Sequence, residues 1–166
     1  MRVLTFSRTY PSYHKRNGYP THFVEKIYQS LFNQGLSYGS NELPIELENF
    51  CNPHHFIEPK EHTIRIGNRW KEGDWFSPRV WSGKPYCSKQ IIIANPIQIK
   101  KTWDIRINFG IEVLRINGND FEGRGDSVLA KLAKNDGLSI DDFIDWFGKK
   151  EFNGQIICWN DKVEYL

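Results

Sequence analysis

Four short apolar runs between residues 90 and 116 constrain the fold more than any other feature of the chain. Asn95-Pro96 and Gly110 separate them, and each run is rich in isoleucine. Short β-branched runs punctuated by turn residues are typical of antiparallel strands. We predict strands at residues 90–94, 97–100, 103–107 and 111–116. Strands so closely spaced favour a small β-barrel.

Helical patterns precede and follow these strands. Residues 22–32 repeat apolar side chains at helical spacing, with Thr21 placed to cap the helix and Gly35 to end it. Residues 128–134 and about 140–149 form two further predicted helices, the second opened by a capping box at Ser139. Strands at residues 62–66 and 155–159 complete the set. The sequence therefore predicts an α+β fold, a small barrel of mostly antiparallel strands with flanking helices.

The length of 166 residues fits a single domain. Residues 1–20 contain two internal prolines and a glycine, which predict an irregular N-terminal arm, and the acidic residues 36–59 resemble a surface insertion. No apolar run is long enough to span a membrane. The three cysteines are widely spread, so we expect a cytoplasmic protein without a disulfide framework.

Charge is unevenly distributed along the chain. Residues 60–106 contain ten Lys and Arg but four Asp and Glu, whereas residues 107–166 contain seven and eleven. Clustered basic side chains suit an anion such as nucleic acid, because neutralising phosphates releases counterions. Balanced solvated charge is the alternative, since charge bias reports partners only loosely.

One stretch of the basic segment combines cations with an aromatic residue, which on a barrel rim would lie at the mouth of a cleft. Lys84, Tyr86 and Lys89 surround a Gly-Pro turn, and Arg79 precedes it. Such groups suit a phosphate and a stacked base. A hairpin loop with solubilising lysines explains the same residues. The candidate ligand-binding residues, including those of the preceding strand and turn, are Arg65, Arg69, Lys71, Arg79, Lys84, Tyr86 and Lys89.

A second stretch, Lys60-x-x-Thr63-Ile-Arg65, begins the strand at residues 62–66. Strand alternation predicts Thr63 and Arg65 on one face, with Ile64 and Ile66 on the core face. Lys60 and Thr63 differ by three positions, so their side chains meet only if the chain bends near Lys60.

This stretch resembles the ASCH domain of the PUA-like superfamily. The resemblance rests on Lys60-x-x-Thr63-x-Arg65, the following Gly73-Asp74 turn, and the helical segment from residue 133 to 147. It extends over about residues 23–159, with residues 36–59 as an insertion. The resemblance implies a PUA-like barrel and membership of a bacterial or phage type. It also implies a basic cleft, built around Lys60-x-x-Thr63-x-Arg65, that binds RNA or a nucleotide; we call it the Lys60 cleft.

The same resemblance implies an alternative activity. A subset of ASCH proteins hydrolyses N4-acetylcytidine with a Lys, a Thr and a Glu, which would make Lys60 the base and Thr63 the nucleophile. Asp136 aligns with the Glu and is one methylene shorter. A threonine hydroxyl needs a neighbouring base, and Lys60 can serve only if its pKa falls. Cleavage of RNA is a related possibility, and an accessory protein that binds another protein through its arm is a third.

One group of cysteine and histidine residues was weighed as a metal site. Cys51-x-x-His54-His55 with His62 provides soft ligands, but the paired spacing of zinc sites is missing. We expect no metal and no cofactor.

Overall fold

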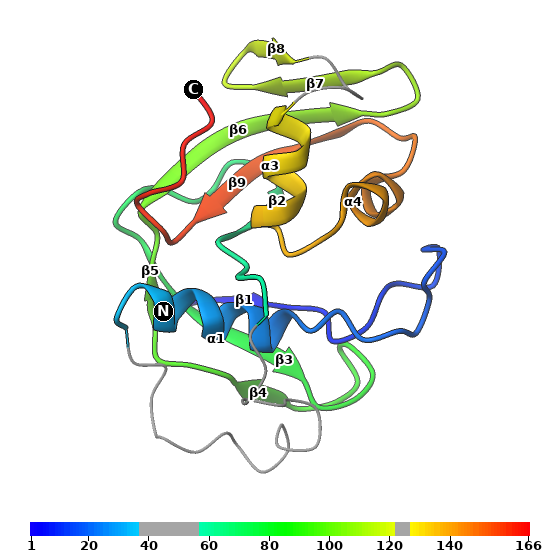
Figure 1. Cartoon of the computed structure of the whole chain (residues 1–166). Helices are drawn as coiled ribbons and strands as arrows, with labels where there is room; N and C mark the ends of the chain where they lie inside the picture. The colour runs from blue at the N-terminus through cyan, green and yellow to red at the C-terminus, as the bar shows by residue number, and fades with distance from the viewer. Residues whose placement is uncertain (37–56, 122–126) are drawn as a thin grey trace. The chain divides into compact units, whose positions relative to one another are not determined.

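The computed structural model describes residues 1–36, 57–121 and 127–166 (Figure 1). The chain divides into two compact units, each discontinuous in sequence. The first unit contains residues 1–59 and 75–98, and the second contains residues 60–74 and 99–166. None of the described helices is both long and apolar enough to cross a membrane.

The first unit is a small sheet with one described helix. Its elements are β1 (Arg2–Thr5), α1 (Phe23–Asn33), β3 (Trp75–Trp81), β4 (Gln90–Ile92) and β5 (Ile97–Gln98). β3 pairs in parallel with β1 and antiparallel with β4 and β5. Phe76 and Val80 on β3 are fully buried, so this strand forms the centre of the unit's core.

Helix α1 forms as its apolar spacing predicts. Phe23, Val24, Ile27 and Leu31 are buried along one side. The predicted Thr21 cap is wrong: the N-cap is His22, in the left-handed region and without a side-chain cap hydrogen bond. Thr21, one residue earlier, accepts a hydrogen bond from the Phe23 N–H at 3.4 Å through its hydroxyl.

The N-terminal stretch differs from the irregular arm that the sequence predicts, because residues 2–5 form β1. Beyond β1, the chain turns back on itself, with the Tyr10 N–H donating to the Tyr19 carbonyl. Tyr10 and His14 are buried, and the Arg16 guanidinium lies 4.8 Å from the centre of the Tyr10 ring. These contacts fold the segment onto itself.

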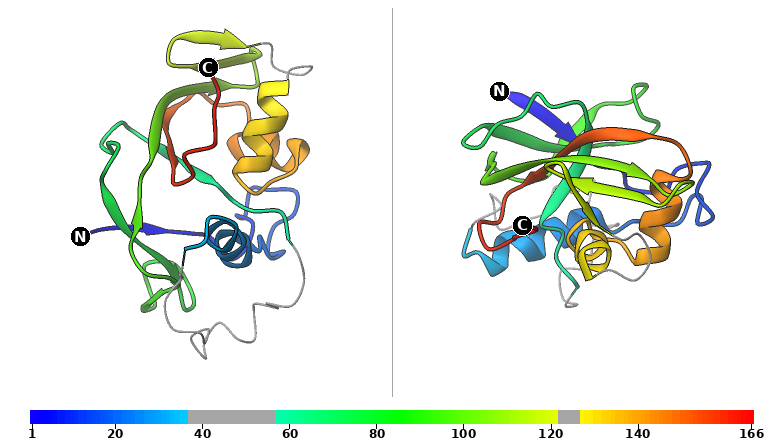
Figure 2. Two further views of the ribbon diagram at one scale, coloured as in Figure 1. Left: turned by 60° about the vertical axis from the view of Figure 1, so that its left-hand side comes forward. Right: turned by 90° about the horizontal axis from the view of Figure 1, so that it is seen from above.

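The second unit is a five-stranded antiparallel sheet with two described helices. Its strands, in spatial order, are β2 (His62–Ile66), β9 (Phe152–Cys158), β6 (Lys101–Asn108), β7 (Val113–Ile116) and β8 (Asn119–Phe121). Helices α3 (Ser127–Asn135) and α4 (Ile140–Phe147) lie on one face of this sheet (Figure 2). Apolar residues of that face, with Leu132 and Phe143 of the helices, form the core: Ile105, Ile107, Leu114, Ile116 and Ile156.

The α+β prediction with mostly antiparallel strands is confirmed. The described strands form two open sheets, and no closed barrel is found among them. The Ser139 cap is also confirmed, since its hydroxyl accepts from the Asp142 N–H at 3.1 Å. Burial of Ile66 is wrong: its side chain is 78% exposed, because β2 is an edge strand and Ile66 is its last residue. The predicted insertion at residues 36–59 falls largely outside the described residues.

Gly154 allows β9 to approach β2 closely. A Cβ atom at this position would lie 2.1 Å from the Arg65 carbonyl oxygen, so backbone would have to move. We expect Gly154→Ala to lower the free energy of unfolding by about 1–3 kcal/mol, the usual cost of overpacking. Gly83→Ala is the control, because its added Cβ would meet nothing closer than 3.5 Å. Urea denaturation of both variants gives the comparison, and equal stability losses would contradict the expectation.

Candidate functional site

A buried ion pair joins the start of β2 to the end of α3 in the second unit. Lys60 is 1% exposed and Asp136 is 6% exposed. The Lys60 Nζ donates to Asp136 Oδ1 at 2.6 Å and to the Asp136 carbonyl at 2.5 Å. The carbonyls at a helix C-terminus carry partial negative charge, so an ammonium group is stabilised there. Lys60 therefore neutralises the Asp136 carboxylate and also caps the C-terminus of α3.

Backbone hydrogen bonds fix this junction. The Glu61 N–H donates to the Asn135 carbonyl at 2.7 Å, and the Glu61 carbonyl accepts from the Trp159 N–H at 3.2 Å. The second bond continues the pairing of β2 with β9 by one residue beyond His62. The segment before β2 therefore stays in register with the sheet as it reaches the end of α3.

His62 lies beside the pair. Its Nδ1 is 3.6 Å from Asp136 Oδ1, and its Nε2 is 2.6 Å from the Tyr165 hydroxyl oxygen. Burial lowers the pKa of His62 below its usual 6.5, although the neighbouring Asp136 opposes the shift. Asn135 Nδ2 donates to the same Tyr165 hydroxyl at 2.9 Å.

The carboxylate remains ionised despite its burial. Burial alone would raise the pKa of Asp136, but the Lys60 charge, the adjacent His62 ring and the hydrogen bond from Lys60 outweigh it and hold the pKa below its usual value. Burial also raises the pKa of the nearby Cys158 thiol to about 12, which removes it as a nucleophile near neutral pH. The cluster at neutral pH thus consists of one ion pair, a neutral imidazole and a phenol.

Thr63 lies on the face of β2 opposite to the one that carries His62. Strand alternation turns Thr63 and Arg65 away from His62, and His62 is on the face that meets Asp136. The structure thus brings Lys60 and Asp136 together and separates Thr63 from them. The bend near Lys60 that would join Lys60 to Thr63 is replaced by the continued pairing at Glu61. Thr63 is buried and Arg65 is partly buried.

The predicted ligand-binding residues divide between the units. Arg65, Arg69 and Lys71 belong to the second unit, and the last two are exposed in the turn after β2. The turn is anchored by Trp70, whose backbone exchanges two 3.0 Å hydrogen bonds with the Gln155 amide. Arg79, Lys84, Tyr86 and Lys89 belong to the first unit.

We call residues 82–89, which connect β3 to β4, the hairpin tip. The Ser88 hydroxyl accepts from the Gly83 N–H at 3.0 Å and donates to the Lys84 carbonyl at 2.9 Å. The Ser82 N–H donates to the Lys89 carbonyl at 2.9 Å, which closes the loop. Arg8 Nη1 also donates to the Ser82 carbonyl at 3.2 Å. The tip is therefore ordered by its own hydrogen bonds.

Tyr86 is the unusual residue of the hairpin tip. Its side chain is 88% exposed, and its φ of 63° places a bulky residue in the left-handed region. The ring lies 5.2 Å from the Trp81 ring, at an angle of 50°. Lys84 and Lys89 are exposed in the same loop. Arg79 is engaged instead with Ser77 and Gln90 on neighbouring strand positions.

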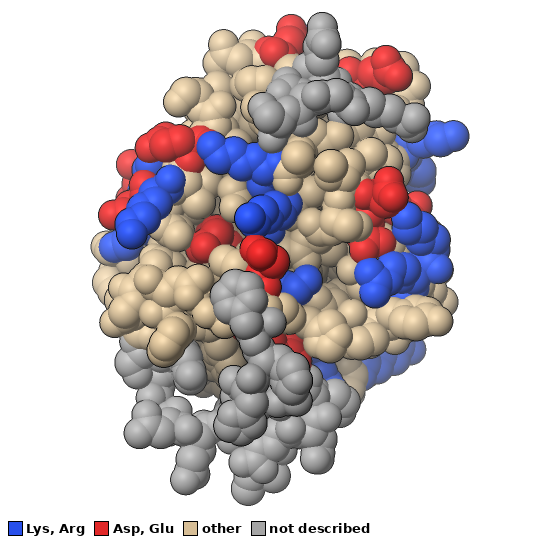
Figure 3. All heavy atoms as spheres, in the orientation of Figure 1, with Lys and Arg blue, Asp and Glu red and all other residues tan. Residues whose placement is uncertain are grey.

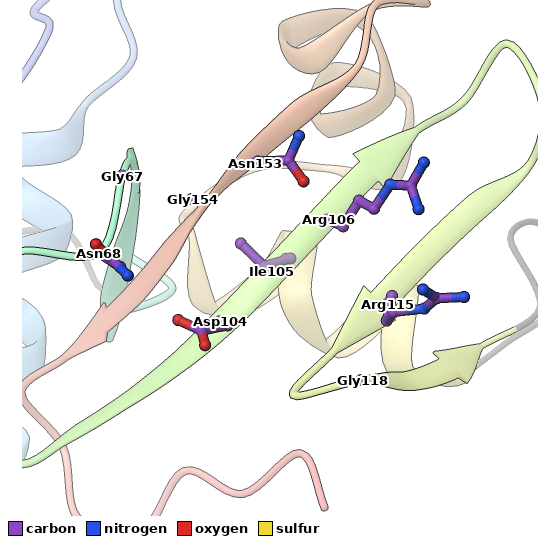
Figure 4. Close-up of a pocket in the computed structure, with 9 residues that line it drawn as sticks. All are labelled: Gly67, Asn68, Asp104, Ile105, Arg106, Arg115, Gly118, Asn153 and Gly154. Carbon is purple, nitrogen blue, oxygen red and sulfur yellow. The ribbon is translucent and has the colours of Figure 1, made fainter.

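An open pocket of about 370 Å³ lies on the five-stranded sheet (Figure 4). Figure 4 shows it on the face turned away from α3 and α4. Arg106 on β6 and Arg115 on β7 are cross-strand neighbours that line the pocket. Their charges are neutralised by Glu151 and Asp120, respectively, each at 2.6 Å. These residues were not predicted, although the alternation of polar residues along β6, at 104, 106 and 108, was a signal in the sequence.

Basic and acidic side chains are interspersed on the helix-bearing side of the second unit, in the upper part of Figure 3. Lys60 is 1% exposed, so it adds almost no positive charge to the surface of the described residues. The described residues contain no group of three His, Cys, Asp or Glu side chains that could hold a metal ion. Cys51, His54 and His55 lie outside the described residues.

Comparisons with known proteins found no relative of this chain. No family model, no curated protein and no solved structure matches this chain.

The burial of His62 predicts a pH dependence of stability. In the unfolded chain, His62 takes up a proton near pH 6.5, whereas in the folded chain its lowered pKa keeps it neutral to lower pH. The unfolded state therefore binds more protons below pH 6.5. We expect the free energy of unfolding to fall between pH 7.5 and 5.5, by up to about 1.4 kcal/mol per pH unit. Asp136 contributes only at lower pH, because its stabilisation is present above its unfolded pKa of 3.8.

Urea denaturation across this range tests the His62 contribution. His62→Gln should flatten the dependence, whereas His22→Gln, a change at an exposed histidine, should retain it. An unchanged slope in His62→Gln would show that another group titrates.

Proposed function

We propose that this protein binds single-stranded RNA through the hairpin tip of its first unit. The observation that carries the proposal is Tyr86, a large aromatic side chain that is 88% exposed on a strained backbone. A non-glycine residue in the left-handed region costs of order 1–3 kcal/mol and persists where the surroundings enforce it, often at functional sites. Here the hydrogen bonds of Ser82, Gly83 and Ser88 enforce it.

The chemistry of the tip suits a nucleotide strand. An exposed aromatic ring is a stacking platform for any base, and such stacking contributes about 1–3 kcal/mol per base. Lys84 and Lys89 are exposed on either side of Tyr86 in the sequence and supply charge for phosphates. The ring is partly supported by Trp81, which limits the entropy lost when a base stacks on it.

The family resemblance belongs to the same proposal. The α+β fold with antiparallel-rich sheets agrees with an ASCH domain of the PUA-like superfamily at a coarse level. The resemblance supports RNA as the ligand, and a cytoplasmic location suits such a ligand. The binding surface that we propose differs from the Lys60 cleft, because Lys60 is buried and its charge is used by Asp136.

Titration of a fluorescent unstructured RNA of about ten nucleotides, followed by anisotropy, tests the proposal. Contacts from two lysines predict an affinity that falls about sevenfold between 50 and 200 mM salt. Replacing both Lys84 and Lys89 by Gln should weaken binding and flatten this salt dependence. Replacing both Lys149 and Lys150 by Gln changes the net charge equally and is the control. Absence of binding, or equal losses in both double variants, would refute the proposed surface.

Amide hydrolysis of an N4-acylated cytidine is the second candidate. The 2.6 Å contact between Lys60 and Asp136 favours it, because the resemblance pairs these positions. Two features weigh against it: the Asp136 carboxylate and carbonyl already hold the Lys60 amine, at 2.6 and 2.5 Å, and Thr63 lies on the opposite face of β2. Incubation with N4-acetylcytidine tests it. Turnover that Thr63→Ala abolishes would support the hydrolase, and turnover that Thr63→Ala leaves unchanged would remove Thr63 from the mechanism.

A further inference from the structure

The segment that follows β9 carries two buried side chains without forming a helix or strand. In residues 160–166, Val163 and Tyr165 are buried, at 7% and 6% exposed. Lys101 Nζ of β6 donates to the Val163 carbonyl at 3.0 Å, and Lys131 Nζ of α3 donates to the Glu164 carbonyl. The segment thus lies between β6 and α3, and the lysine amines bind its backbone carbonyls (Figure 1).

The ring of Tyr165 occupies a slot of the second unit. Trp103 lies 5.1 Å away at an interplanar angle of 78°, and His62 lies 5.8 Å away at 63°. Lys131 Nζ is 5.7 Å from the centre of the ring. Two aromatic side chains and one ammonium group therefore surround the flat six-membered ring of Tyr165.

The inner end of the slot is polar. His62 Nε2 and Asn135 Nδ2 both meet the Tyr165 hydroxyl, at 2.6 and 2.9 Å. Behind them lies the buried pair of Lys60 and Asp136, and His62 Nδ1 has no hydrogen-bond partner within the described residues. So many buried polar groups argue against a purely structural role for Tyr165, because apolar side chains would fill the same space at a lower cost in desolvation free energy.

Glu164 adds a negative charge beside the ring. Its carboxylate pairs with Lys101 Nζ at the outer end of the slot, and its side chain is 62% exposed. Glu164 and Tyr165 together therefore present a flat ring with a polar edge and an adjacent anion. A nucleotide presents the same features, as a base with hydrogen-bonding atoms and a phosphate.

We propose that residues 160–166 fill a nucleotide-binding slot in the second unit, and that a 5′-mononucleotide with a single-ring base displaces Glu164 and Tyr165. The base would replace the phenol ring against Trp103, and its edge would meet His62 and Asn135. The phosphate would take the lysines that now bind the segment, Lys101 and Lys131. The hydrogen bonds that these lysines give to the segment are readily exchanged for phosphate, because the donors lie near solvent. This site is separate from the hairpin tip, so either proposal stands without the other.

Calorimetric titration with uridine 5′-monophosphate tests the slot. A site that its own chain covers for most of the time binds with an affinity reduced by the open fraction. The double variant Glu164→Ala, Tyr165→Ala should therefore bind at least tenfold more tightly than the wild type. Adenosine 5′-monophosphate should bind more weakly than uridine 5′-monophosphate, because the slot holds one six-membered ring. In that background, Lys131→Gln should reverse much of the gain.

A milder variant guards against loss of folding. Glu164→Gln changes an exposed side chain and removes only the competing anion. It should tighten binding of the monophosphate at least twofold and tighten binding of uridine less, because uridine gains from the weaker cover but has no phosphate to take Lys101. Glu151→Gln, at an exposed glutamate paired with Arg106, should leave both ligands unchanged.

Hydrogen exchange of the wild type gives an independent readout. Uridine 5′-monophosphate should accelerate exchange of the amides in residues 163–166, because the segment leaves its slot. A folded double variant that binds no more tightly than the wild type would overturn the proposal, as would ligand-bound wild type with unchanged exchange. Equal affinity for the adenosine and uridine monophosphates would overturn the single-ring assignment.

Discussion

Asp136→Asn is expected to lower the free energy of unfolding by about 3–5 kcal/mol, because it leaves the buried Lys60 ammonium without its counter-charge. Asparagine keeps the size and one acceptor oxygen, so little of the loss arises from a cavity. The Lys60 amine is 2.6 Å from the carboxylate and 1% exposed, and water cannot replace the lost charge. Urea denaturation at pH 7 with linear extrapolation gives the change.

Two further variants separate the charge effect from other causes. The double variant Lys60→Met, Asp136→Leu removes both charges and should recover much of the stability lost in Asp136→Asn, since buried pairs are often replaced by apolar residues at little cost. Asp120→Asn breaks an exposed pair with Arg115 and should change stability far less. A loss below about 1 kcal/mol in Asp136→Asn would show that the pair is not buried as described.

Tyr86→Gly is expected to weaken RNA binding about 5- to 150-fold, which corresponds to the loss of one stacked base. The same change should not destabilise the fold, because glycine adopts a φ of 63° without strain and the ring contributes little buried surface. Tyr86→Trp should retain binding, since it keeps the stacking surface. Anisotropy and urea denaturation of each variant give the two quantities.

The control for Tyr86 is Phe32, an exposed aromatic residue at the end of α1, 69% exposed. Phe32→Ala should leave RNA affinity unchanged. If Tyr86→Gly binds RNA as the wild type does, the exposure of the ring has another cause. If it lowers both affinity and stability, Tyr86 acts through the structure of the hairpin tip rather than through a base.

Local patterns predicted most of the elements but not all of their partners. The apolar spacing of residues 22–32 predicts α1, and the Ser139 cap predicts the start of α4, because helical spacing and capping depend on neighbours in the sequence. β1 was missed because its pairing partner, β3, lies more than 70 residues away, and Arg2–Thr5 alone is too short to be distinguished from an arm. Ile66 was misplaced because alternation gives the face of a strand but not where the sheet ends.

The candidate site shows the same division. Exposure of Lys84, Tyr86 and Lys89 follows from a Gly-Pro turn, which local residues indicate. The meeting of Lys60 and Asp136 needed the resemblance, because nothing local relates residues 76 positions apart. The role of Tyr165 had no signal in the sequence at all, since its surroundings come from β2, β6 and α3.

Photo-crosslinking to RNA that contains 4-thiouridine, followed by mass spectrometry of the peptides, tests the central claim most directly. A base that stacks on Tyr86 should give its main adduct within residues 82–89, and Tyr86→Gly should remove that adduct. Adducts confined to other segments, or a pattern that Tyr86→Gly leaves unaltered, would contradict RNA binding at the hairpin tip.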